Sequence, residues 1–230
     1  MKQLLEYIAA WTILKGLGLL PRRGALAAGR GIGLAAYRLA GGLRRTGRRN
    51  LEIAFPERPA EEREAILRGA FVNLGRQLGE FSQLPKLRTP EDAERTIRFV
   101  HRERVAEALA SGRGVLFLTG HMGAWELTPF CLRLSGSPPV NFLVRPIDNP
   151  RVERLADGYR TRCGNRTIEK RDAARPVLAA LRRGEMVGIL TDLNTLEREG
   201  VFVDFFGTPA STTTGLAVFA LRTDAVVLPG

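Results

Sequence analysis

The segment that decides the fold is "GVLFLTGH", which runs from Gly114 to His121. It is an apolar run of strand length that ends in Gly-His, and a helix-length amphipathic stretch near 124–134 follows it. Similar apolar runs recur at 140–144, 186–190 and 225–228, and the other helix-length stretches fall near 102–111, 150–163, 173–183 and 213–222. This alternation predicts an α/β fold with a central mixed sheet flanked by helices.

The composition describes one globular domain with an uneven charge. The chain has 230 residues, 44% of them apolar, and a net charge of +11. Residues 1–50 hold ten basic side chains against one acidic side chain, a net +9. An anionic membrane surface, a nucleic acid or an acidic protein would each be attracted to such a segment. Two cysteines and two histidines, far apart, give neither a disulfide framework nor zinc-site spacing, so we expect no metal.

The N-terminal segment has the pattern of a membrane-associated helix. Residues 4–20 are mostly apolar, interrupted by Glu6 and Lys15, and are short for a spanning helix. Residues 24–42 fit an interfacial helix better than a spanning one. A cleaved signal peptide or a buried helix would be the alternatives, but charges inside the apolar run argue against a signal peptide. The basic flank on the C-terminal side predicts a cytoplasmic body.

The remaining organisation follows from helical spacing and from turn-forming residues. Residues 58–82 read as helical, and residues 84–92 as a proline-containing connector. We expect a membrane-anchor and basic helical segment at 1–45 and a larger domain at 46–230. Nucleic-acid binding is not expected, because Tyr37 is the only aromatic residue within the basic segment 22–49.

Three apolar runs end in polar residues that are common in active sites. His121 follows the first run, Arg145 the second and Asp192 the third. In open α/β sheets, ligands bind beyond the carboxyl ends of the strands. We therefore expect these three side chains to face one site.

The pattern His121-x4-Glu126 suggests a general base with a carboxylate partner. If Gly123 is the N-cap of the following helix, Glu126 is its N3 residue and its carboxylate can reach back to the imidazole. No Ser or Cys stands beside His121, so the substrate would supply the attacking hydroxyl. The alternatives are a capping-box glutamate and a buried, hydrogen-bonded histidine. His101 reads as a surface or helix-cap residue, and Trp125 as a packing residue.

Several blocks resemble a known family. "GHMGAWEL" (120–127), "VRPIDNP" (144–150), "RRNLEIAFPE" (48–57) and the turn "FFG-x-P-A" (205–210) resemble the lipid A biosynthesis acyltransferases of the lauroyl/myristoyl group. The resemblance implies a glycerolipid-acyltransferase-like fold. It implies His121 as general base, with Glu126 as its partner. It also implies substrate contacts from Arg145, Asn149 and Asp192, and an oxyanion stabilised by Arg145 or by amides near Gly120–Gly123.

The implied activity is transfer of a fatty acyl chain from acyl-carrier protein or acyl-CoA to a hydroxyl of a lipid-linked sugar. The expected acceptor is a lipid A precursor at the cytoplasmic side of the bacterial inner membrane, with membrane lipids and acyl-carrier protein as partners and no cofactor. The alternatives are a phosphatidylinositol mannoside or other glycolipid acceptor, and a non-catalytic membrane-binding relative.

Two features depart from the family pattern. Leu193 stands where the family usually has Gln or His after the aspartate. The chain also ends at "VVLPG", while the family commonly continues for several dozen residues, so we expect a C-terminally truncated form.

Overall fold

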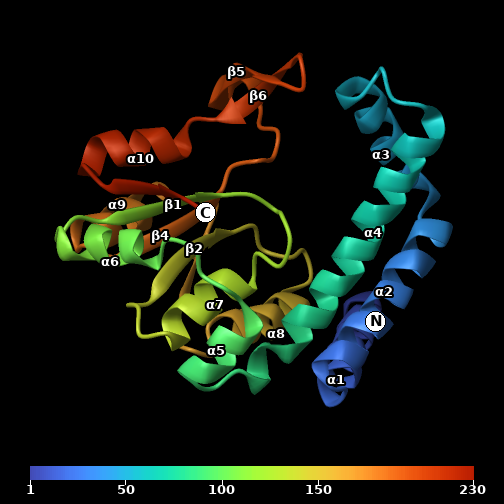
Figure 1. The fold of residues 1–230 in the computed structure, drawn as a ribbon, viewed down its shortest axis with the longest axis horizontal. Helices are drawn as coiled ribbons and strands as arrows, with labels where there is room; N and C mark the ends of the chain where they lie inside the picture. Colours follow the sequence, from blue (N-terminus) through green and yellow to red (C-terminus); the bar gives the residue numbers. More distant parts are fainter. The chain divides into compact units, whose positions relative to one another are not determined.

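The computed structural model describes residues 1–230. Its α-helices are α1 Lys2–Leu19, α2 Arg22–Leu39, α3 Gly41–Ala54, α4 Ala60–Gln83, α5 Pro90–Thr96, α6 Arg102–Ala110, α7 Leu127–Leu134, α8 Pro150–Arg160, α9 Ala174–Arg182 and α10 Gly215–Thr223 (Figure 1). Its strands are β1 Val115–Thr119, β2 Val140–Val144, β3 Arg166–Glu169, β4 Met186–Leu190, β5 Gly200–Phe205, β6 Thr208–Thr213 and β7 Val226–Pro229, and 3₁₀ turns lie at Leu84–Lys86 and Glu197–Glu199.

The chain forms two compact units. The sheet unit comprises Met1–Trp11, Leu84–Gly200 and Thr212–Gly230, and the helical unit comprises Thr12–Gln83 and Val201–Ser211. This division concerns packing and does not show which residues meet a membrane. The functional division into 1–45 and 46–230 therefore stays a prediction.

The central sheet has five strands in the order β3-β2-β4-β1-β7. Every neighbouring pair runs parallel, so the prediction of a mixed sheet was wrong. The reason is that each connection between successive strands of this sheet passes through at least one helix, which returns the chain to the same end of the sheet. The tight hairpin of β5 and β6 forms a separate two-stranded sheet.

Both faces of the central sheet are covered by helices, as its parallel pairing requires. On one face, Leu116 of β1 and Val187 of β4 pack with Val177 and Leu181 of α9 and Leu216 of α10. On the other, alternate residues of β1, β2 and β4 pack with α6. The face covered by α6 is called the α6 face, and His121 lies two residues beyond the end of β1.

Most elements predicted from the sequence are confirmed, but β3, the two hairpin strands β5 and β6, and α5 were missed. The strands expected at 140–144 and 186–190 have those bounds, and those expected at 114–119 and 225–228 are offset by about one residue. β3 was missed because its exposed edge position needs no apolar run. α5 was missed because Pro90 was interpreted as a connector residue, whereas Pro is favourable in the first turn of a helix.

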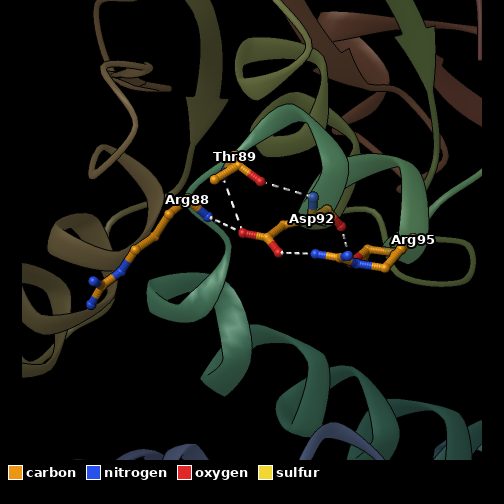
Figure 2. Close-up of polar contacts among 5 residues, drawn as sticks. Arg88, Thr89, Asp92 and Arg95 are labelled. Atoms are coloured by element: carbon orange, nitrogen blue, oxygen red, sulfur yellow. Dashed lines mark hydrogen bonds and ion pairs between the residues drawn. The ribbon is translucent and has the colours of Figure 1, made fainter.

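A capping box explains why α5 begins at Pro90 (Figure 2). The Thr89 hydroxyl accepts a hydrogen bond from the Asp92 amide, and the Asp92 carboxylate accepts from the amides of Arg88 and Thr89. Arg95 also donates to this carboxylate at 2.8 Å. These hydrogen bonds, chiefly those from Arg88 and Arg95, lower the pKa of Asp92 to about 2. The cap thereby stabilises the connector that leads to α6.

In the helical unit, α2 and α4 approach each other through glycines. A Cβ on Gly33 would lie 2.2 Å from the carbonyl oxygen of Phe71, and one on Gly75 would lie 2.1 Å from that of Gly29. Only residues without a side chain permit this backbone contact. No helix in the chain has both the length and the hydropathy to cross a bilayer.

We predict opposite effects for two alanine substitutions in α2. Gly33→Ala should destabilise the protein by at least about 2 kcal/mol, because its Cβ overlaps rigid backbone of α4. The matched control, Gly31→Ala, has open space around its Cβ and should stabilise by roughly 0.5–1 kcal/mol through helix propensity. Thermal unfolding of both variants checks the prediction, and equal shifts in Tm would contradict the close helix contact.

Candidate active site

The register of β1 and β4 brings His121 and Asp192 together. Thr119 pairs with Leu190 at the ends of these strands, and His121 and Asp192 each follow two residues later along the chain. His121 Nδ1 lies 2.8 Å from Asp192 Oδ1, and the His121 amide donates to Asp192 Oδ2 at 2.7 Å. One carboxylate therefore fixes both the backbone and the ring of one histidine.

Gly120 makes this contact possible. A Cβ at residue 120 would lie 3.1 Å from Asp192 Oδ2 and 3.2 Å from its Cγ. Such contacts are tighter than van der Waals packing normally allows, so a larger residue would push the carboxylate away. The sequence prediction placed Gly120 at the site for its backbone amide, and the structure gives it this steric role.

The contact between His121 and Asp192 also determines the ionisation of the Asp192 carboxyl group and the tautomer of the His121 ring. Partial burial alone would raise the pKa of Asp192, but the hydrogen bonds from the imidazole and the amide of His121 outweigh it and lower the pKa. An ionised Asp192 only accepts hydrogen bonds, so a neutral His121 carries its proton on Nδ1. Its Nε2 then has a free lone pair, and the side chain is 37% exposed and accessible to a substrate.

Glu126 lies in a different arrangement from the one predicted. Helix α7 begins at Leu127, so Glu126 is its N-cap residue and not N3, and Gly123 has φ +56° and is not the cap. The Glu126 carboxylate accepts a bidentate pair of hydrogen bonds from Arg160 of α8, the shortest at 2.7 Å. His121 makes its carboxylate contact with Asp192 instead.

The Glu126–Arg160 ion pair is largely shielded from solvent. Its side chains are only 14% and 17% exposed. Burial opposes the charge on Arg160, but the contacts with Glu126 prevail and raise the pKa of the guanidinium. Sequence reasoning missed Arg160, because a single arginine within an amphipathic helix gives no signal of its own.

A cavity of about 450 Å³ adjoins His121. Apolar residues from the α6 face of the sheet form much of its wall, among them Phe117, Phe142, Val144 and Leu190. His121, Arg145 and the Glu126–Arg160 pair contribute its polar groups. Of the three residues expected at one site, His121 and Arg145 line the cavity, and Asp192 contacts His121 without lining it; a shared functional site stays a prediction.

The other two predicted substrate-binding side chains, those of Arg145 and Asn149, lie in different surroundings. Arg145 lines the cavity, is exposed and makes no ion pair with the protein. Asn149 is not among the lining residues. Its side chain caps α8 through the Arg151 amide and donates to Gln3 and Glu6 of α1, so it is buried in a structural contact. The structure does not bring it to the site.

The backbone amides expected to stabilise an oxyanion are partly occupied. The amide of His121 donates to Asp192, and that of Met122 donates to the Gly120 carbonyl at 2.8 Å. Gly123 lies in an exposed turn. Arg145 is therefore the better placed of the two groups expected to stabilise an oxyanion.

Two aromatic residues complete the surroundings of His121 and the cavity rim. His101 occupies the N-cap position of α6 with φ +58°, as its helix-cap reading predicted, and lines the cavity. Trp125 lies edge-on to the His121 ring, with 5.1 Å between centroids, and also lines the cavity.

The family model described as bacterial lipid A biosynthesis acyltransferase matches residues 2–230. The chain belongs to this family. A lipid A biosynthesis acyltransferase of Haemophilus influenzae is 28% identical over 78% of this chain and 56% of its own length. The lipid A biosynthesis myristoyltransferase and lauroyltransferase of Escherichia coli are each 28% identical, over 79% and 87% of this chain and 55% and 65% of their own lengths.

The match to the lipid A biosynthesis acyltransferase family confirms the resemblance found in "GHMGAWEL" and "VRPIDNP". The chain spans between about half and two thirds of the length of these relatives. The family match covers the block His121-x4-Glu126. In the structure, His121 contacts Asp192 and Glu126 contacts Arg160.

We predict that the tautomer of His121 depends on Asp192. In Asp192→Asn only one acceptor oxygen faces two donors, the His121 amide and Nδ1–H, so the ring should lose its fixed Nδ1–H form. Imidazole ¹⁵N NMR checks this directly, because the chain has only two histidines and His101 serves as an internal reference. An unchanged His121 spectrum in the variant would contradict the contact.

Proposed function

We propose that this chain is a membrane-associated acyltransferase that moves a fatty acyl chain from a thioester to a hydroxyl of a lipid A precursor. The observation that carries the proposal is the fixed His121, with Nε2 free, beside an apolar cavity in a chain of this family. The relatives are named for lipid A acyl transfer, and this chemistry needs both a base and a site for a hydrocarbon chain.

His121 acts in this proposal as a general base on the acceptor. Its Nε2 takes the proton of the acceptor hydroxyl while the oxygen attacks the thioester carbonyl carbon. Asp192 holds the ring and stabilises the imidazolium that forms. The carbonyl oxygen becomes an oxyanion, which the unpaired Arg145 stabilises. When the intermediate collapses, the C–S bond breaks and the imidazolium returns the proton to the departing thiolate.

The apolar cavity accommodates the acyl chain. Its volume of about 450 Å³ lies within the usual range of ligand pockets, roughly 300–1,000 Å³. The Glu126–Arg160 pair lies in the same wall, where it supplies a rigid polar boundary beside apolar strand residues. In this proposal Glu126 shapes the cavity through Arg160, and the orienting carboxylate of His121 is Asp192.

The donor and the location belong to the same proposal. Acyl-carrier protein and acyl-CoA both present a thioester, and acyl-carrier protein is acidic, which suits a chain of net charge +11. Membrane attachment at the cytoplasmic side of the inner membrane is supported by the basic and apolar segments at 1–45 and by a lipid acceptor. The chemistry involves no metal or cofactor.

Acyl transfer with membranes that contain the expressed chain tests the proposal. The donors are labelled acyl-carrier protein and acyl-CoA, and the acceptors are a tetraacylated lipid A precursor and a phosphatidylinositol mannoside. Transfer to the lipid A precursor should fall by about 10²- to 10⁴-fold in the near-isosteric His121→Asn. Transfer only to the mannoside would reassign the acceptor, and no transfer by folded, membrane-bound protein would point to a non-catalytic relative.

A second prediction concerns the length of the cavity. Gly188 lies in β4 on the cavity wall, and a Cβ there would meet Phe142 at 3.7 Å, an ordinary contact. Gly188→Leu should therefore fold and fill part of the cavity. We expect long acyl donors to lose kcat/KM by about tenfold or more relative to shorter ones. Gly188→Ala is the matched control with a small effect, and an unchanged chain-length profile in Gly188→Leu would place the acyl chain elsewhere.

A further inference from the structure

The hairpin of β5 and β6 exposes an unusual amount of apolar surface. Val201, Phe202, Val203, Phe205 and Phe206 are 52%, 58%, 42%, 56% and 51% exposed. Successive residues of a strand point to opposite faces, so both faces of this two-stranded sheet are apolar. An exposed, contiguous apolar patch of this kind marks a surface that binds a membrane or another protein.

The turn of the hairpin adds a second observation. Phe206 and Gly207 connect the strands with φ +55° and +71°, and such turns favour Asn-Gly. A bulky residue in this left-handed conformation is rare, because its Cβ crowds the backbone. The chain thus keeps a strained phenylalanine at the tip of an exposed hairpin, where a polar residue would be more stable in water.

Basic helix α3 lies against this aromatic tip within the helical unit. The rings of Phe55, at the end of α3, and Phe206 pack edge to face with 5.0 Å between centroids, and Arg58 lies over the Phe55 ring. Helix α3 carries Arg44, Arg45, Arg48 and Arg49, of which Arg48 pairs with Glu64 of α4 and Arg49 with Glu52, and none of the residues of α3 is buried. The helical unit as a whole has thirteen basic and seven acidic side chains, a net +6.

We infer that the β5–β6 hairpin and α3 form a docking surface for an anionic phospholipid bilayer. Exposed aromatic rings enter the headgroup region readily, and adjacent arginines are attracted to anionic headgroups. An acidic protein such as acyl-carrier protein would match the charge, but a patch that is apolar on both faces of a hairpin beside arginines matches the apolar interior and the anionic headgroups of a bilayer together. The inference does not depend on acyl transfer, and through the β5–β6 hairpin it adds a contact outside the N-terminal segment at 1–45.

Depth-dependent quenching tests where the hairpin lies. Phe205→Trp adds a tryptophan to the hairpin, and Leu221→Trp adds one at a position in α10 that is 88% exposed. Both variants are bound to vesicles of phosphatidylethanolamine and phosphatidylglycerol with brominated acyl chains. We expect the added fluorescence to be quenched in Phe205→Trp and largely retained in Leu221→Trp. Vesicle-bound Phe205→Trp without added quenching, or equal quenching in both variants, would overturn the inference.

Affinity measurements test the two components of the surface. Phe202→Ser with Phe205→Ser should weaken partitioning into these vesicles by about tenfold or more. Arg45→Ala should weaken it by roughly fivefold on anionic vesicles and hardly at all on neutral phosphatidylcholine vesicles. Leu221→Ser is the control and should have little effect. Unchanged partitioning of the double variant, or its conversion of an oligomer to a monomer, would assign the hairpin to another partner.

Discussion

The contact between His121 and Asp192 is the constraint on which the site depends. One carboxylate accepts hydrogen bonds from the imidazole and from the amide of the same residue, so neither the ring nor the strand end can move alone. The parallel register of β1 and β4 provides the alignment, and Gly120 provides the space. A histidine held in this way has its tautomer and its ring direction set by the fold, which is what the proposed role as a general base requires.

The two acidic residues near the cavity have different physical environments and hence different roles. Asp192 is partly exposed and holds the histidine, while Glu126 is shielded and neutralises Arg160. A buried guanidinium without its partner would be costly, so the Glu126–Arg160 pair is held together by the low polarity around it. The pair in turn fixes the start of α7 to α8 across the cavity wall.

The helical unit combines tight internal packing with an apolar and basic exterior. Glycines allow α2 and α4 to pack backbone to backbone. Many of the arginines and exposed apolar residues of the unit lie outside the contact between α2 and α4. Exposed apolar and basic surface of this kind is costly in water and is typical of surfaces that meet a partner or a membrane.

The sequence alone determined four strands of the central sheet and most of the helices, the position of His121, Arg145 and Asp192 after strand ends, and the family. These features follow from local periodicity and from ordered motifs, which need no knowledge of the fold. The sequence did not determine that the sheet is wholly parallel, that Asn149 is buried against α1, or that Arg160 takes Glu126. Nor did it show which carboxylate holds His121. That choice is between a residue five positions away and one 71 positions away, and only the pairing of β1 with β4 decides it.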